Sequence, residues 1–91
     1  MGLPRVAVIG CGNWGKNLVR NFAELGVLHS VCDANQELAI QAAQAYDVPN
    51  HSFEDVLKSD CDGVVIAAPA AQHFDLTQRA LHAGKHVFVE K

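Results

Sequence analysis

A glycine-rich segment near the amino terminus constrains this chain more than any other feature. Gly10-Cys11-Gly12-Asn13-Trp14-Gly15 follows the short β-branched run Arg5–Gly10, which is typical of a strand buried on both faces. After it, apolar residues recur at helical spacing over Asn13–Leu25, and Gly26 closes that segment. A buried strand, a glycine-rich turn and an amphipathic helix in this order predict the opening unit of a parallel sheet.

The rest of the chain alternates predicted strands with predicted helices. Further strands are expected over Val27–Cys32, Val48–His51, Asp62–Ala68 and His86–Glu90. Further helices are expected over Asn35–Tyr46, from the capping pair Ser52 and Asp55 to Lys58, and from about Ala71 to Ala83. Strands separated by helices imply parallel pairing with right-handed crossovers. The expected architecture is therefore α/β, a doubly wound parallel sheet (Rossmann fold) of five strands in the order 3-2-1-4-5, formed by residues 1–91 as one domain.

Each glycine of the opening segment has a separate task in a dinucleotide-binding turn. Gly10 allows the tight turn out of the strand, Gly12 lets a pyrophosphate approach the backbone, and Gly15 lets the helix pack close to the sheet. The amino end of the following helix, from Asn13, offers N–H groups and a positive dipole end to an anion. In this context the segment predicts a site for the diphosphate of a dinucleotide.

An acid at the end of the second predicted strand indicates which dinucleotide binds. Asp33 lies 23 positions after Gly10 and 18 after Gly15, where a carboxylate can accept hydrogen bonds from the adenosine ribose hydroxyls. The same charge would repel a 2′-phosphate, and no arginine follows within the next several residues, so NAD is predicted rather than NADP. The alternative is a plain glycine turn, with a solvent-exposed Asp33 that only caps the helix beginning near Asn35.

The residues between the glycines, and Cys32 near them, could either contact the cofactor or fill space in the core. Asn13 and Trp14 are counted with the glycines among the cofactor-binding residues, although the helical spacing of Trp14 with later apolar residues favours core packing for the indole. Cys11 and Cys32 flank the predicted site, and we expect them to be small apolar fillers rather than nucleophiles.

Composition and charge argue against several classes of partner and site. The net charge is −3 and no run of lysine or arginine occurs, so neither nucleic acid nor an anionic membrane surface is an expected partner. No apolar stretch approaches the roughly 20 residues of a spanning helix, and the amino terminus lacks a signal-peptide layout, so a cytoplasmic location is expected. The cysteines include no CxxC pair, and Gly84 separates His82 from His86, so no disulfide framework and no metal site are expected.

Four segments stand in a characteristic spacing, namely the GCGNWG loop, Asp33, AAPAAQHFDLTQRALHAGKHV and the final FVEK. Together they resemble the N-terminal half of the glucose–fructose oxidoreductase/inositol dehydrogenase/MocA family, and the likeness covers essentially all 91 residues. The string GNWGKNLVRNF is similar to that of members that oxidise sugar nucleotides, such as UDP-N-acetylglucosaminuronate dehydrogenases. The resemblance implies an NAD-dependent sugar oxidoreductase, with a sugar or sugar-nucleotide substrate and hydride transfer at a secondary alcohol carbon.

The resemblance also implies roles for residues in the second half of the chain. Ala68, Pro69 and His73 would lie in the loop after the fourth predicted strand, along the ribose and nicotinamide side of the cofactor. Glu90 and Lys91 match the Glu-Lys pair of the family's Glu-Lys-Pro motif, with the glutamate assigned to the cofactor site and the lysine to catalysis. Removing hydride from an alcohol requires its O–H proton to leave, and the resemblance implies that Lys91 helps to move that proton.

The family pattern continues beyond Lys91 with a proline, a sixth strand and a second domain that carries most substrate contacts. The chain is therefore expected to be the cofactor-binding half of a small-molecule oxidoreductase, truncated before its catalytic domain and inactive by itself. Two other interpretations stay open, a stand-alone module that senses NAD or CoA and a non-catalytic fragment. In the fragment, the apolar strand HVFVE would be an unpaired sheet edge that favours a homo-oligomer.

Overall fold

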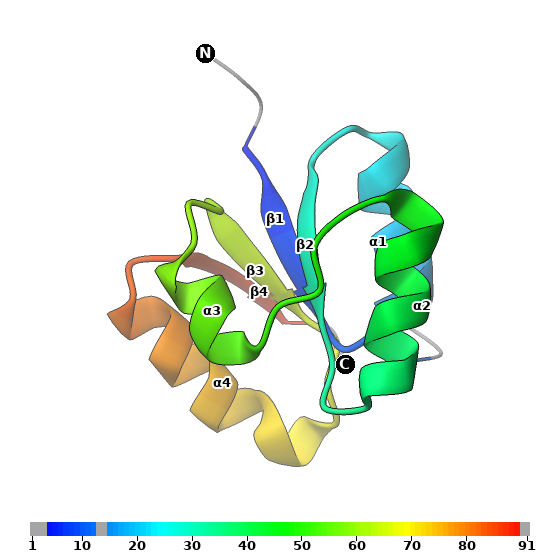
Figure 1. Ribbon diagram of the computed structural model, residues 1–91. Coiled ribbons are helices and arrows are strands. Elements are labelled where there is room, and N and C mark those ends of the chain that lie inside the picture. The colour runs from blue at the N-terminus through cyan, green and yellow to red at the C-terminus, as the bar shows by residue number, and fades with distance from the viewer. Residues whose placement is uncertain (1–3, 13–14, 90–91) are drawn as a thin grey trace.

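The computed structural model describes residues 4–12 and 15–89, in which strands alternate with helices. The strands are β1 (Val6–Ile9), β2 (Leu28–Cys32), β3 (Gly63–Ile66) and β4 (His86–Val89). The helices are α1 (Gly15–Glu24), α2 (Gln36–Tyr46), α3 (Phe53–Lys58) and α4 (Ala70–His82). In Figure 1, α1 and α2 cover one face of the sheet while α3 and α4 cover the other. None of the helices in this described part is long and apolar enough to cross a membrane.

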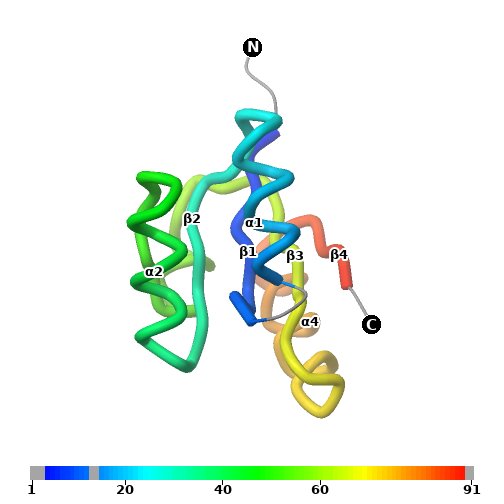
Figure 2. Tube along the Cα trace, turned by 90° about the vertical axis from the view of Figure 1, so that its right-hand side faces the viewer, coloured from blue at the N-terminus to red at the C-terminus, as the bar shows by residue number. Residues whose placement is uncertain are grey.

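The strands of the described residues form one parallel sheet in the order β2-β1-β3-β4. Ala7 of β1 is paired with Ser30 on one side and with Val64 on the other, and Val64 is paired in turn with Val87. Figure 2 shows β4 at the side of the molecule away from α2. The parallel, doubly wound α/β fold is confirmed, but within residues 4–12 and 15–89 the sheet has four strands where five were predicted.

The segment predicted as a third strand, residues 48–51, forms a single bridge instead. Val31 of β2 bridges to Asn50 in parallel. The Val31 N–H donates to the Pro49 carbonyl at 3.0 Å, and the His51 N–H donates to the Val31 carbonyl at 3.0 Å. Proline has no N–H to donate, so the ladder is not continued through it. The segment therefore lies beside β2, where the predicted order places it, but the prediction of a fifth strand is wrong.

The core consists of two layers, one on each face of the sheet. The layer under α3 and α4 takes its strand residues from alternate positions, Ala7, Ile9, Val64 and Ile66. The layer under α1 and α2 takes the positions between them, Val6, Val8, Val31 and Val65. All residues of β1 and β3 are buried, as continuous apolar runs predict for strands covered on both faces.

Local sequence signals set the ends of the helices. The Asn35 side chain caps α2 by accepting from the Glu37 N–H at 3.0 Å. Ser52 Oγ accepts from the Asp55 N–H at 3.1 Å, which is the capping contact predicted at the start of α3. Gly84 has a φ of +79° just after α4, which confirms the predicted stop.

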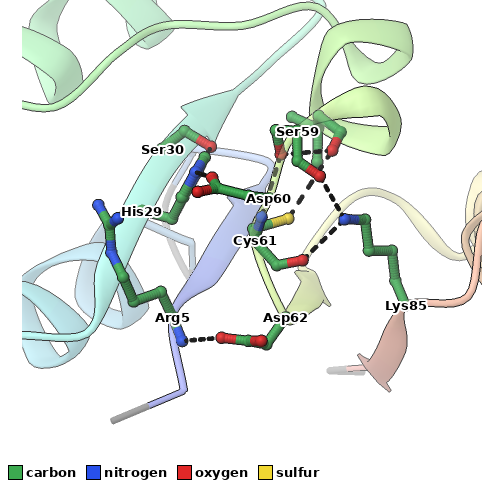
Figure 3. A network of polar contacts seen from close by, with 9 residues as sticks. Arg5, His29, Ser30, Ser59, Asp60, Cys61, Asp62 and Lys85 are labelled. Atoms are coloured by element: carbon green, nitrogen blue, oxygen red, sulfur yellow. Dashed lines mark hydrogen bonds and ion pairs between the residues drawn. The ribbon is translucent and has the colours of Figure 1, made fainter. Parts of the chain in front are cut away.

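Polar contacts join the amino ends of the strands (Figure 3). Lys85 Nζ, just before β4, donates to the carbonyl oxygens of Ser59 at 2.6 Å and Cys61 at 2.7 Å. The backbone N–H of Arg5, just before β1, donates to the Asp62 carboxylate at 2.8 Å. These bonds hold the starts of β1, β3 and β4 together, at the end of the sheet opposite to the glycine loop.

Candidate dinucleotide-binding site

A cleft of about 750 Å³ opens at the carboxyl ends of β1, β2 and β3. Its walls come from the glycine loop, the residues that follow β2 and β3, and the first turns of α2, α3 and α4. The lining residues include Gly10, Gly12, Asp33, Phe53, Ala68 and Gln72. The chain places β2 on one side of β1 and β3 on the other, and the crevice at such a reversal is where doubly wound sheets bind ligands.

The glycine loop has the backbone geometry that a diphosphate site requires. Gly10 has a φ of +104°, and a Cβ there would lie 2.9 Å from the Ala67 backbone. Gly15 packs so closely that a Cβ on it would overlap the Gly10 carbonyl oxygen. A Cβ at Gly12, in contrast, would meet no protein atom within 4 Å. The backbone at Gly12 thus faces open space, so the residues present fit an approaching phosphate oxygen.

Asp33 lines this cleft with its carboxylate bonded to two backbone amides. Oδ2 accepts from the Cys11 N–H at 2.7 Å, and Oδ1 accepts from the Asn35 N–H at 2.8 Å. Each carboxylate oxygen has a second lone pair, so a ribose hydroxyl can still donate to it. The bond to Asn35 is the turn contact expected of a purely structural aspartate, whereas the bond to Cys11 was not expected.

Cys11, within the glycine loop, and Cys32, at the end of β2, are neutral thiols. Burial, and after it the negative charge of Asp33, raises the pKa of each thiol to about 11. Cys11 Sγ also donates to the Cys32 carbonyl oxygen at 3.7 Å. Because the thiolate is the reactive form of cysteine, the structure supports the expectation that both residues fill space.

The loop after β3 brings two of its three predicted residues to the cleft. Ala68 and Pro69 line the cavity, while His73 Nε2 lies 2.5 Å from the Ala68 carbonyl oxygen. The imidazole of His73 thus holds the backbone of the loop, and the α4 side chains that line the cavity are Gln72 and Leu76.

Four predicted site residues lie outside the described residues, and their roles stay predictions: Asn13, Trp14, Glu90 and Lys91. Other lining side chains were not predicted, including Gln36, Ser52, Phe53, Gln72 and Leu76. All but Leu76, which lies in the second turn of α4, are at the amino ends of α2, α3 and α4. The available sequence signal was that position, because the helices of such units begin at the carboxyl ends of the strands.

A second polar cluster has the composition of a hydrolytic triad but lies at the amino ends of the strands (Figure 3). His29 Nδ1 is 2.9 Å from Ser30 Oγ, and His29 Nε2 is 2.9 Å from Asp60 Oδ1. Ser30 is fully buried, so its hydroxyl cannot reach a substrate. The hydrogen bond from His29 lowers the pKa of the Asp60 carboxyl. The cluster therefore joins β2 to the loop before β3 and has a structural role.

Comparison with known sequences reveals extensive similarity. Residues 4–91 match a family described as an oxidoreductase family with an NAD-binding Rossmann fold. The chain is 32% identical over 87 residues to a UDP-N-acetylglucosamine 3-dehydrogenase of Acidithiobacillus ferrooxidans, a match covering 96% of this chain and 28% of that protein. It is 34% identical over 100 residues to a glycosyl hydrolase family 109 protein of Shewanella sp. (strain ANA-3), covering 94% of this chain and 22% of that protein.

A solved dehydrogenase structure is also similar to this chain over nearly its whole length. The WlbA dehydrogenase from Bordetella pertussis, in complex with NADH and UDP-GlcNAcA, matches with a TM-score of 0.89 and 32% identity, over 99% of this chain and 30% of that one. The chain thus spans less than a third of the length of these relatives. The family's NAD-binding Rossmann fold confirms NAD as the predicted cofactor. The chain belongs to the glucose–fructose oxidoreductase/inositol dehydrogenase/MocA family of oxidoreductases with an NAD-binding Rossmann fold, as its motifs predict.

Proposed function

We propose that residues 1–91 are the dinucleotide-binding domain of an oxidoreductase that transfers hydride between NAD and a secondary alcohol of a sugar or sugar nucleotide. One observation carries the cofactor part of this proposal. The open backbone at Gly12 and the carboxylate of Asp33 line the same cleft at the carboxyl ends of β1 and β2. A dinucleotide needs both features together, one for its diphosphate and one for its adenosine ribose.

Residues of this chain would hold the cofactor at three places. The backbone of the loop from Gly12 to Gly15 would bind the diphosphate, and Asp33 would accept hydrogen bonds from the ribose. Ala68 and Pro69 line the cleft beyond β3 and would contact the nicotinamide side. When bound, NAD supplies the hydride acceptor of the reaction, or in the reverse direction NADH supplies the donor.

The substrate class rests on relatives and on the last two residues. One similar dehydrogenase is named for UDP-N-acetylglucosamine and another was solved with UDP-GlcNAcA, which supports a sugar nucleotide as the substrate. Glu90 is proposed to belong to the cofactor site, and Lys91 to move the hydroxyl proton as hydride leaves the same carbon. Since this chain spans less than a third of those relatives, the other substrate contacts are proposed to come from residues outside 1–91.

The glycosyl hydrolase family 109 relative favours a second candidate, a glycosidase built on the same NAD-binding half. Its identity to this chain, 34%, is as high as that of the dehydrogenase, 32%. The two candidates differ in their net products. With a full-length protein containing this sequence, a dehydrogenase produces NADH in proportion to the sugar consumed. A glycosidase releases the aglycone from an aryl glycoside without net NADH.

Titration calorimetry of the chain with NADH and with NADPH tests the cofactor part. We expect NADH to bind at millimolar concentration or below and NADPH to bind more weakly, because Asp33 repels the 2′-phosphate. Asp33→Ala should weaken NADH binding and narrow the difference between the two cofactors. Glu37→Gln, which removes an exposed charge from the first turn of α2, is the matched control and should preserve that difference.

Two results would contradict this interpretation. The absence of binding heat with millimolar NADH argues against the NAD site itself. An NADH-to-NADPH affinity ratio that Asp33→Ala leaves unchanged argues against the role of the aspartate.

A further inference from the structure

The carboxylate of Asp33 lines the cleft and also accepts a hydrogen bond from the backbone of the glycine loop. At the end of the β1–β2 ladder, the Gly10 N–H donates to the Cys32 carbonyl at 2.7 Å. One residue further along both strands, the Cys11 N–H donates to Asp33 Oδ2, also at 2.7 Å. Gly10, with a φ of +104°, turns the chain at this point. The Asp33 side chain thus adds a bond between the two chain segments just beyond the end of the ladder.

The second oxygen of the same carboxylate fixes the orientation of the first. Oδ1 accepts from the Asn35 N–H at 2.8 Å, and the Asn35 side chain caps α2 through the Glu37 N–H at 3.0 Å. Rotation of the Asp33 carboxylate would break one or both of its bonds. A continuous chain of contacts therefore runs from the amino end of α2 through Asp33 to Cys11.

We propose that Asp33 is a positioning residue for the glycine loop, in addition to being the proposed ribose ligand. By holding the Cys11 N–H, it keeps the loop in the conformation that exposes the Gly12 backbone to a diphosphate. This role rests on the proposed function, because it concerns binding of the same nucleotide. The charge of Asp33 by itself repels a diphosphate. Its positioning effect and its charge effect on diphosphate binding therefore have opposite signs.

A nucleotide without ribose hydroxyls separates these effects. The probes are ADP and 2′,3′-dideoxy-ADP, which carry the same diphosphate and the same base. If Asp33 positions the loop, Asp33→Ala weakens binding of the dideoxy nucleotide by about tenfold, the scale of one charge-assisted hydrogen bond. If Asp33 contacts the ribose alone, the same substitution leaves dideoxy binding unchanged or strengthens it, which would overturn the proposal. Glu37→Gln is the charge control and should change dideoxy binding less than about twofold.

Hydrogen exchange at the Cys11 amide provides a readout that needs no ligand. We expect Asp33→Ala to speed exchange at Cys11 by about tenfold or more, while exchange at Val8 inside the β1 ladder stays the same. Asp33→Ser guards against a folding defect in the alanine variant. A serine can still make the local turn bond to the Asn35 N–H, but its single oxygen leaves Cys11 without that acceptor. It should therefore reproduce the fast Cys11 exchange.

The outcomes distinguish the positioning role from the proposed function. If the unsubstituted chain binds neither ADP nor NADH, the proposed function is wrong and the positioning role falls with it, while Cys11 exchange still reports the contact. If ADP binds, both dideoxy affinity and Cys11 exchange must change in Asp33→Ala. A change in only one of them, or in neither, overturns the positioning role.

Discussion

Gly12 and Gly15 are three residues apart, yet only Gly15 is required by the packing of the protein itself. A Cβ at Gly12 meets no protein atom within 4 Å, whereas one at Gly15 overlaps the Gly10 carbonyl oxygen. We expect Gly12→Ala to leave the free energy of unfolding within about 0.5 kcal/mol. The same variant should weaken NADH binding by about tenfold or more, because the methyl group takes the space of a phosphate oxygen.

Gly15→Ala is the matched control for that prediction. It should lower the thermal midpoint clearly, because α1 must shift away from the end of β1 to admit the methyl group. Thermal unfolding and NADH titration of both variants provide the test. Tight NADH binding by Gly12→Ala would show that the diphosphate does not approach the backbone at this glycine.

Cys11 in the glycine loop and Cys32 at the end of β2 are expected to be inert at ordinary pH. Burial and the charge of Asp33 raise the pKa of Cys11 and of Cys32 to about 11. At pH 8 only about a thousandth of each is then thiolate, and the reactive fraction increases tenfold with each pH unit. Alkylation of the folded chain with iodoacetamide, mapped by mass spectrometry, should therefore be slow at both sites and accelerate up to about pH 11. Rapid labelling of Cys11 near neutral pH would assign it a reactive role instead.

At the scale of the element, the local sequence predicts the ends of helices better than it predicts which segments pair as strands. The cap at Ser52 and the stop at Gly84 follow from residues within a few positions, and both are confirmed. The missing strand depends on tertiary pairing, since β2 offers a neighbouring edge but Pro49 cannot donate to it. In the candidate site, the position of Asp33 at the end of a predicted strand was enough to place it in the cleft. The contribution of Leu76, in the second turn of α4, depends on how this helix packs against the sheet, which no local pattern encodes.

The link between β2 and the loop before β3 leads to a pH prediction. The hydrogen bond from His29 lowers the pKa of Asp60 from its ordinary value of 3.8. A carboxyl whose pKa is lowered by folding contributes stability above its unfolded pKa, and that contribution is lost as the pH falls through the lower folded value. Asp60→Asn should therefore reduce the thermal midpoint near neutral pH, and the difference should shrink as the pH falls below 3.8 and vanish below the lowered pKa of the folded chain.

Glu24→Gln, an exposed carboxylate at the end of α1, is the control for that measurement. It should not reproduce the pH-dependent loss, because it removes a charge without removing the contact to His29. A difference between Asp60→Asn and the unsubstituted chain that persists unchanged in strong acid would show that the charge of Asp60 is not responsible.

For the molecule as a whole, stabilising contacts and the candidate site occupy opposite ends of one sheet. The bonds made by Arg5, His29 and Lys85 lie at the amino ends of the strands (Figure 3). The cleft with Gly12 and Asp33 lies at the carboxyl ends. This separation allows substitutions in the cleft to change nucleotide binding while the polar contacts at the other end stay intact.

The open side of the sheet provides the last prediction. β4 lies at the edge of the molecule (Figure 2), and its residues Phe88 and Val89 are 59% and 44% exposed. An edge strand with exposed apolar side chains is a template for pairing with another strand, and lysine on such an edge prevents it. We therefore expect the 91-residue chain to self-associate through β4, and Phe88→Lys to reduce the mass measured by light scattering at high concentration. Leu25→Lys, at a residue that is 66% exposed but far from β4 in the sequence, is the control and should still associate. An unsubstituted chain that stays monomeric at high concentration would refute pairing through this edge.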